Sequence, residues 1–305
     1  MFNQILTEMS GALHSADVGV FQAVNSWCGN VLLDRVVQLE ENSRFFRTGI
    51  LLTVLWWFWF AHQDERRKLD RRRIVAALIG VVFALVAARA LALVMPLRAR
   101  PMYVSGIGYH PPSTPPVPNM MDWSSFPSDT ATVVIALSFG VVYLSRRLGV
   151  VLLAFSALWV CLPRLYLGLH YPSDLIIGGL LGAIVVWACV TATDAGNGAL
   201  GRRIMAPLEE AEERRPQLFY AAAFALSFEI ASMFGDIQNL VREMTFHLHH
   251  AGHPDLGATA VMFVLGGMLL ALVAIVSAAA LTWRMSHRGR IVSRPIGGGP
   301  TETSP

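Results

Sequence analysis

Long apolar segments alternate with short polar ones along most of the sequence. Seven mostly apolar stretches lie at about 45–62, 74–96, 127–145, 148–163, 173–193, 217–235 and 258–283. Segments of about 18 or more mostly apolar residues are typical of helices that cross a membrane. The pattern therefore predicts an all-α integral membrane protein, a helical bundle of six to seven transmembrane helices, in which the first and fourth stretches are the shortest spans.

The composition also favours a membrane protein. Of the 305 residues, 54% are hydrophobic and only 15% are charged, and the mean hydropathy is +0.50. A soluble domain of this size cannot bury so large an apolar fraction. The three cysteines, Cys28, Cys161 and Cys189, are scattered and follow no spacing that is typical of a disulfide framework or a metal site.

The chain divides into five predicted regions. An amphipathic segment at 1–44 has no signal-peptide pattern, and we expect it at the membrane interface or against the bundle. The transmembrane core follows at 45–195, then a cytoplasmic linker helix at 196–216 and additional transmembrane helices at 217–284. The tail at 285–305 is rich in Gly, Pro and Ser, so we expect it to be disordered.

Basic residues predict the orientation of the helices. The loop DERRKLDRRR at 64–73 is strongly basic, and short basic loops face the cytoplasm. Alternate threading from this loop places the basic groups at 146–147, 202–203 and 214–215 on the same side. We therefore expect a multi-pass protein of a bacterial-type inner (plasma) membrane, with the segments 97–126, 164–172 and 236–257 on the outer, periplasmic face.

Three polar segments meet at this outer face in the predicted threading. They are LRARPMY at 97–103, SSFPSDTA at 124–131 and PRLYLGLHYPSD at 163–174, and each lies at the outer end of a predicted membrane helix. Alternating helices bring such ends to one membrane face. The sequence therefore predicts that residues far apart in the chain form a single site there.

The residue types in these segments suit the binding of a phosphate group. Arg100 and Arg164 are permanently charged forks that bind phosphate oxygens. Ser128 lies where we expect the first turn of a helix, whose free N–H groups attract anions. Asp174 follows His170 by four positions, and a carboxylate that accepts one imidazole N–H leaves the other nitrogen free to attack phosphorus. Together they predict a phosphate pocket that contains a nucleophile.

These motifs resemble those of the type 2 phosphatidic acid phosphatase (PAP2) superfamily, over roughly residues 85–190. Its three signatures have the forms K-x6-R-P, P-S-G-H and S-R-x5-H-x3-D. The matching residues here are Leu93, Arg100 and Pro101, then Pro127, Ser128, Asp129 and Thr130, and finally Pro163, Arg164, His170 and Asp174. The resemblance implies a PAP2-like core at 45–195 and the hydrolysis or transfer of a lipid-linked phosphate through a phosphohistidine on His170.

By the same resemblance, Asp174 and the residue at the Thr130 position act in catalysis beside His170. The phosphate would be bound by Arg100, Arg164, Ser128 and Asp129, with Arg98 as a further candidate. Two departures from the signatures affect this site: Leu93 replaces the family's lysine, and Thr130 replaces the histidine that protonates the leaving group.

The lost positive charge has two candidate replacements, Arg89 and Arg98, and the sequence does not decide between them. For the lost acid, His110 in the loop GIGYHPPSTPPVPN could approach the site or could simply be solvated. The loss of the acid favours a diphosphate substrate. An alkoxide leaving group has a conjugate acid about as weak as water, with a pKa near 15.7, whereas a phosphate leaving group has a second pKa of about 6 and needs little protonation.

The sequence thus predicts an integral membrane lipid phosphatase or phosphotransferase that cleaves a lipid-linked diphosphate, of polyprenyl type such as undecaprenyl diphosphate, at the outer membrane face. The motif SFPSD resembles the corresponding motif in the branch of the family that cleaves undecaprenyl diphosphate. No metal or other cofactor is expected, because arginines carry the positive charge, and no nucleic-acid partner is expected. The alternative is a catalytically impaired relative that binds or transports an anionic lipid or scaffolds a membrane complex.

Two further features have simpler interpretations. The segment HLHHAGH at 247–253 could bind zinc or copper, but carboxylate or cysteine partners at a suitable spacing are absent, so an exposed polar loop explains it equally well. The glycines of IIGGLLG, which are Gly178, Gly179 and Gly182, provide a small-residue face for close helix packing. The lipid, the acceptor and the oligomeric state are left open by the sequence.

Overall fold

The computed structural model describes residues 2–113, 121 and 123–232, and all the regular structure in them is helical. Short helical turns at Phe45–Gly49, Pro101–Tyr103 and Ser156–Cys161 accompany the main helices. The main helices are α1 (Phe2–Asn25), α2 (Val31–Asn42), α3 (Ile50–Ala61), α4 (Asp64–Val94), α5 (Asp129–Val142), α6 (Arg146–Phe155), α7 (Leu162–Tyr166), α8 (Pro172–Arg214) and α9 (Pro216–Ala231). The predicted all-α class is confirmed for this part of the chain.

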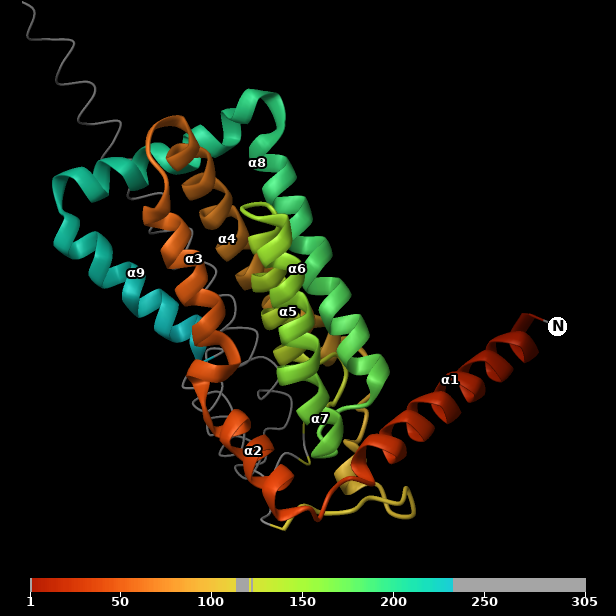
Figure 1. The fold of residues 1–305 in the computed structure, drawn as a ribbon. Coiled ribbons are helices and arrows are strands. Elements are labelled where there is room, and N and C mark those ends of the chain that lie inside the picture. Colours follow the sequence, from red (N-terminus) through yellow and green to blue (C-terminus); the bar gives the residue numbers. More distant parts are fainter. Residues whose placement is uncertain (1, 114–120, 122, 233–305) are drawn as a thin grey trace, which may run out of the picture.

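Helices α4, α5 and α8 form the centre of the bundle and pack against one another more extensively than the other helices described (Figure 1). Their contact faces are lined by fully buried apolar side chains such as Val81, Leu137 and Val186. The remaining helices pack around this centre, because each has an apolar face that would otherwise be exposed. Helix α1 extends away from the bundle, and its C-terminal part lies close to α7 and α8 (Figure 1).

Glycines allow α8 to approach α5 very closely. A Cβ atom added at Gly178 would lie 2.5 Å from the carbonyl oxygen of Ser128, and one added at Gly182 would lie 2.3 Å from that of Thr132. Any side chain at these two positions would force the helices apart. The structure therefore agrees with the packing role predicted for the glycines of IIGGLLG.

Three of the described helical segments are long and apolar enough to cross a membrane: Glu65–Val94, Arg146–Tyr166 and Pro172–Ala195. The apolar helices at Phe45–Ala61 and Asp129–Val142 are shorter. A 14-residue helix such as α5 spans only about 21 Å at 1.5 Å per residue, against a hydrocarbon core of about 30 Å. The predicted count of six to seven spans is therefore not confirmed.

The lengths of two predicted spans also differ from expectation. The fourth stretch, which looked short in sequence, continues through α6, the turn at Ser156–Cys161 and α7, whereas α5 is shorter than its apolar stretch suggested. The chain directly before α5 is irregular and contains Ser124, Ser125 and Ser128, and its backbone is hydrogen-bonded to the segments of the site described below. The predicted span at 258–283 lies outside the described residues.

The predicted linker at 196–216 does not appear as a separate element. Residues 199–214 continue α8 and cross one end of the bundle (Figure 1). Arg71 binds Glu212 at 2.6 Å and Arg72 binds Asp194 at 2.7 Å at this end. The basic segment that begins α4 is therefore neutralised partly by acids from α8.

Candidate functional site

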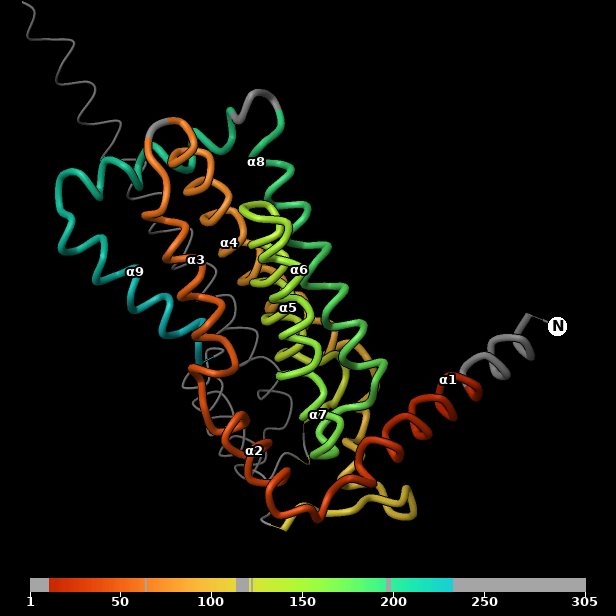
Figure 2. The backbone as a smooth tube through the Cα atoms, in the orientation of Figure 1, coloured from red at the N-terminus to blue at the C-terminus, as the bar shows by residue number. Residues whose placement is uncertain are grey.

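The three polar segments predicted to converge do so at the end of the bundle opposite the basic segment of α4 (Figures 1 and 2). They follow α4, precede α5 and connect α7 with α8. Three backbone hydrogen bonds join them: from Ser125 N to Arg98 O (2.8 Å), from Met102 N to Gly168 O (3.0 Å) and from Ser128 N to Asp174 O (3.1 Å). The site is thus built from segments held together by their main chains.

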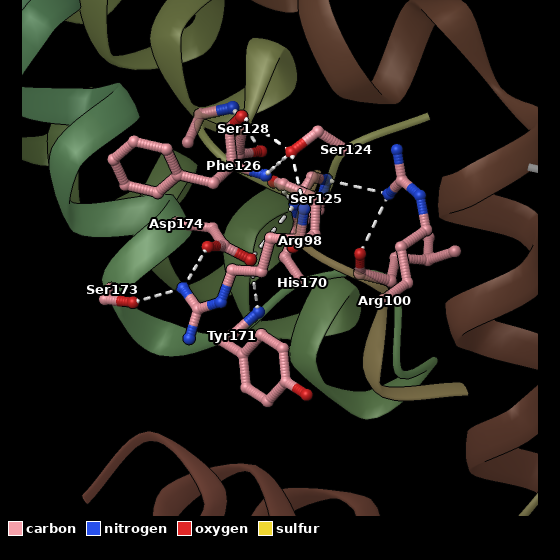
Figure 3. A network of polar contacts seen from close by, with 12 residues as sticks. Arg98, Arg100, Ser124, Ser125, Phe126, Ser128, His170, Tyr171, Ser173 and Asp174 are labelled. Carbon is pink, nitrogen blue, oxygen red and sulfur yellow. Dashed lines mark hydrogen bonds and ion pairs between the residues drawn. The ribbon is translucent and has the colours of Figure 1, made fainter. Parts of the chain in front are cut away.

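His170 lies in the loop between α7 and α8 and is almost fully buried. The loop turns at Gly168, whose φ of +69° is the left-handed conformation that glycine adopts at little cost. The imidazole Nδ1 lies 2.8 Å from the carbonyl oxygen of Ser125 (Figure 3). Because a carbonyl only accepts, Nδ1 carries the proton in this contact, and Nε2 of the neutral ring keeps its lone pair.

Arg100 lies against this nitrogen. Its Nη1 donates a hydrogen bond to the carbonyl oxygen of Leu169 at 2.8 Å and a longer one, at 3.4 Å, to the lone pair of Nε2 of His170. Burial lowers the pKa of Arg100 to about 10, with a further lowering by Arg164 nearby, so the guanidinium stays charged at neutral pH. Its Nε has no hydrogen-bond partner among the described residues. A phosphoryl oxygen would supply that partner.

The environment of His170 keeps its ring neutral. Burial lowers the pKa of His170 below its ordinary value, and the charges of Arg100 and Arg164 lower it further, while Asp174 acts in the opposite direction. A neutral imidazole whose unprotonated Nε2 carries the lone pair is the form that can attack an electrophile, once an incoming phosphoryl group takes the place of His170 as the partner of Arg100.

Asp174 is placed differently from the prediction. Its Oδ2 lies 3.8 Å from Nδ1 of His170, beyond hydrogen-bond distance, and instead accepts the backbone N–H of Tyr171 at 2.8 Å. Its Oδ1 accepts from Nη1 of Arg98 at 2.5 Å. The carboxylate caps the first turn of α8 and binds an arginine. The carbonyl of Ser125 accepts the hydrogen bond from the imidazole Nδ1–H in its place.

Arg98 lies between two carboxylates rather than open to a ligand, and Figure 3 shows its contacts with Asp174 and Ser173. Besides Asp174, it binds Asp17 of α1 through Nη2 at 2.7 Å and donates to the hydroxyl of Ser173 at 2.8 Å. Its guanidinium also lies 4.1 Å from the centre of the Tyr171 ring. The phosphate-binding role predicted for Arg98 therefore has little support in its contacts.

Arg164 is buried on α7 and pairs with a carboxylate from the N-terminal segment. Its Nη2 lies 3.0 Å from Oε2 of Glu41, and its Nε has no hydrogen-bond partner among the described residues. Glu40, the neighbour of Glu41, is also buried, and burial raises its pKa to about 7 despite the opposing charge of Arg164. The predicted phosphate ligand Arg164 thus already has an anionic partner from the protein.

Arg89 and Asp129 form an ion pair across α4 and α5. The guanidinium of Arg89 also lies 4.6 Å from the centre of the Trp123 ring. Leu93, at the position of the family's lysine, is 45% exposed. Neither Arg89 nor Arg98 is thus a simple replacement for the lysine, because each is bound by acidic side chains. Asp129, predicted to bind phosphate, instead binds an arginine.

The start of α5 differs slightly from the prediction. Ser128 is the N-cap, and its hydroxyl accepts from the backbone N–H of Ala131, while Pro127 precedes the cap and follows a cis peptide bond. Thr130 is buried in the first turn. The predicted helix N-terminus is therefore present beside the site, begun one or two residues later than expected.

His110 is exposed, and its backbone is bound to Asn25 at the end of α1, with its N–H donating to the Asn25 side chain at 2.7 Å. This placement favours the interpretation that His110 is solvated and does not replace the lost acid. The histidine-rich segment at 247–253 lies outside the described residues. Within the described part of the chain, the structure shows no group of three or more residues suited to hold a metal ion.

Four contributors to the site were missed by the sequence analysis: the Ser125 carbonyl, Ser173, Asp17 and Glu41. A carbonyl acceptor has no signature in the side-chain sequence. The two acids gave a weak signal, since each lies on an amphipathic helix near apolar residues, but nothing in the sequence indicated which arginine each would bind.

The described residues form a helical bundle with three helices long and apolar enough to cross a membrane, and a buried histidine and arginines meet at one end of it. Comparison with known proteins gives a family match for the core of the chain. Residues 77–197 match the model of the PAP2 superfamily, the family that the motifs resemble.

A curated relative extends the comparison. The chain is 36% identical over 70 residues to the protein named Undecaprenyl-diphosphatase BcrC of Bacillus subtilis (strain 168). The match covers 23% of this chain and 35% of that protein, so the chain spans about a third of the length of the relative that it matches. No solved structure matches the chain significantly.

Proposed function

We propose that this protein is a membrane lipid phosphatase or phosphotransferase that cleaves a lipid-linked diphosphate through a phosphohistidine on His170. The observation that carries the proposal is the placement of His170. Its Nδ1 is bound to the carbonyl of Ser125, and its Nε2 faces Arg100 at 3.4 Å. The match to the PAP2 superfamily model at 77–197 supports phosphatase activity in general.

The proposed reaction has two steps. Nε2 attacks the terminal phosphorus, a P–N bond forms, and the bond from that phosphorus to the bridging oxygen breaks, so that the lipid monophosphate leaves with the electron pair. Water, or an acceptor hydroxyl in a transferase, then attacks the phosphohistidine and regenerates the histidine. Arg100, and Arg164 once it is released from Glu41, would stabilise the phosphoryl oxygens in the transition state.

A polyprenyl diphosphate is the substrate that we favour. Thr130 cannot act as a general acid, and a phosphate monoester leaves without strong protonation because its second pKa is about 6. The name of the Bacillus relative, which is an undecaprenyl diphosphatase, points to the same class of substrate. We further propose that the site faces the periplasm, as the distribution of basic residues predicts.

The test is phosphate release from undecaprenyl diphosphate by purified protein in detergent. The wild-type protein should release inorganic phosphate, and the His170→Ala variant should fall to background because it lacks the nucleophile. His110→Ala is a matched control, since this exposed histidine should leave the rate unchanged. Radiolabelled terminal phosphate should become bound to the wild-type protein in an acid-labile, base-stable form. Equal release by wild type and His170→Ala would overturn the proposal.

A second candidate function is the binding of an anionic lipid without catalysis. The ion pairs of Arg164 with Glu41 and of Arg89 with Asp129 favour it, because two arginines near the site already have acidic partners. A binder would retain undecaprenyl diphosphate in a flotation or fluorescence assay but release no phosphate from it. Release that depends on His170 would exclude this candidate.

A further inference from the structure

Helix α1 brings an acidic side chain to the site from outside the region that matches the PAP2 superfamily. Asp17 is buried, and its carboxylate binds both Arg98 and the start of α8. Oδ1 accepts the backbone N–H of Ser173 at 2.9 Å, and Oδ2 accepts its hydroxyl at 2.5 Å. Since 2–25 precede 77–197, the family signatures contain no position for this residue.

Arg98 connects Asp17 with the site. One guanidinium nitrogen binds Asp17 and the other binds Asp174, at 2.7 and 2.5 Å. Burial alone would lower the pKa of Arg98, but the two carboxylates outweigh it and raise that pKa, so the guanidinium is charged at every pH at which the protein would work. The positive charge of Arg98 therefore persists between the two carboxylates that it binds.

The chain of contacts ends at His170. Asp174, held by Arg98, lies 3.8 Å from Nδ1 of His170, and the backbone that Asp174 caps begins at the next residue, Tyr171. A displacement of Asp174 would change both the charge beside the imidazole and the course of the loop that carries it. Figure 3 shows Arg98 and Ser173 on the side of Asp174 that faces away from Arg100.

We propose that Asp17 and Arg98 are positioning residues, which act through Asp174 to fix the orientation and the charge environment of His170, and that Arg98 is not a phosphate ligand. This inference rests on the proposed function. The N-terminal helix α1 is then part of the active site, because without Asp17 the guanidinium of Arg98 would be paired with Asp174 alone and its positive charge would act more strongly on His170.

The first measurement separates positioning from phosphate binding. Arg98→Met should lower kcat for undecaprenyl diphosphate by about 100-fold, the cost expected for a small misplacement of a reacting group, with KM and inhibition by inorganic phosphate unchanged. Arg98→Lys should recover part of kcat, since it restores the charge. Arg100→Met is the contrasting variant and should weaken inhibition by phosphate. The control Arg146→Met removes an exposed arginine at the other end of the bundle.

The second measurement is the acidic limb of the pH–rate profile, which reports the protonation of His170. The charged groups that face this histidine are Asp174 from α8, Arg100 from the loop after α4 and Arg164 from α7. Arg98→Met leaves Asp174 without its cation, which stabilises the imidazolium. The limb should move to higher pH by about one unit, the lower end of the effect of a charge within ~4–6 Å.

Asp17→Asn should move the limb in the opposite direction. It removes an anion from Arg98, whose positive charge then disfavours the imidazolium, so the pKa of His170 and the limb should fall. Combined with Arg98→Met, the same change should have a much smaller effect, because Asp17 acts through Arg98. If Asp17 and Arg98 had a purely structural role, the two variants would move the acidic limb in the same direction or not at all. Either result would overturn the proposal.

A measurement without turnover keeps the two proposals distinguishable. The protein labelled with ¹⁵N-histidine can be titrated by NMR, with the His170 signal identified by its absence in His170→Gln. The opposite shifts of the His170 pKa are expected even if no lipid diphosphate is hydrolysed, in which case the proposed function alone fails. Weaker phosphate inhibition in Arg98→Met with kcat unchanged would instead make Arg98 a phosphate ligand. If Arg98→Met does not fold, the nearly isosteric Asp17→Asn variant still tests the proposal, because the pKa of His170 should fall in it.

Discussion

Thr130 occupies the place of the proton donor in the PAP2 signature, and it is buried in the first turn of α5 beside the site. A threonine hydroxyl does not release a proton near neutral pH, so a substrate whose leaving group needs protonation would react slowly. The identity of residue 130 therefore affects which substrates react more than it affects the reaction rate of a substrate with a good leaving group.

This leads to a prediction at the scale of the residue. Thr130→His should raise the turnover of lipid monophosphates by a larger factor than the turnover of lipid diphosphates, because only the former expel an alkoxide. Phosphate release from the two substrates measures it. Thr130→Asn is the control, since it adds a similar polar side chain without an acid. An equal gain on both substrates would remove the leaving-group argument for a diphosphate.

The positions of several site residues could be predicted from the sequence, but their contacts could not. Arg100, His170 and the start of α5 were found because motif spacing and helix alternation fix their positions. The contacts of Arg98 and Asp174 were not, because each depends on a partner at least 75 positions away or on a backbone group. Every residue has a backbone carbonyl, so the role of the Ser125 carbonyl cannot be predicted from the residue type.

At the scale of the helices, the closest contact that supports the site is the one between α5 and α8. These helices carry Ser128 and Asp174 at adjacent ends, joined by a backbone hydrogen bond of 3.1 Å. The close approach depends on the glycines of α8, and Gly182 meets the backbone of α5 at Thr132. The separation of α5 and α8 is thus set about two turns of α8 away from Asp174.

Gly182→Ala should therefore destabilise the protein, by about 1–3 kcal/mol as expected for an overpacked contact. The added methyl group would meet a main-chain oxygen at 2.3 Å, which cannot move without the helix. Gly179→Ala is the matched control, because its Cβ would meet only a side-chain carbon of Ile135 at 3.2 Å. Thermal unfolding in detergent compares the two. Equal melting temperatures for both variants would contradict the packing argument.

The helices were predictable where their apolar stretches are long, as for α4 and α8, because nothing else satisfies backbone polar groups in lipid. Their ends were less predictable. Helix α5 is shorter than its apolar stretch because Phe126 and Pro127 belong to the irregular segment that approaches His170. Helix α8 is longer than its apolar stretch because a polar residue well after Ala195, Glu212, pairs with Arg71 of the basic segment of α4.

For the whole molecule, the site and the basic residues of α4 lie at opposite ends of the bundle (Figure 1). The basic end is marked by Arg73, which donates to the carbonyl of Tyr143 at 2.9 Å, at the far end of α5 from Ser128. Positive residues are retained on the cytoplasmic side of membranes. This separation is the physical basis for the proposed outward orientation of the site.

Cysteine labelling in intact cells tests that orientation. In a variant without Cys28, Cys161 and Cys189, a cysteine at Ser105 near the site should react with a membrane-impermeant maleimide from outside. A cysteine at Arg146, which is exposed at the basic end, should react only after permeabilisation. The reversed pattern would place the site in the cytoplasm.

The ion pair of Arg164 with Glu41 has a consequence for the molecule as a whole. In the resting protein, the carboxylate of Glu41 already neutralises Arg164. An incoming anion can bind this arginine only if it displaces that carboxylate, which is tethered nearby at a high effective concentration. A singly charged headgroup gains little from that exchange, whereas a headgroup with two phosphates gains considerably more. Discrimination among the many anionic lipids of a membrane would then begin with charge, before any contact with the hydrocarbon chain.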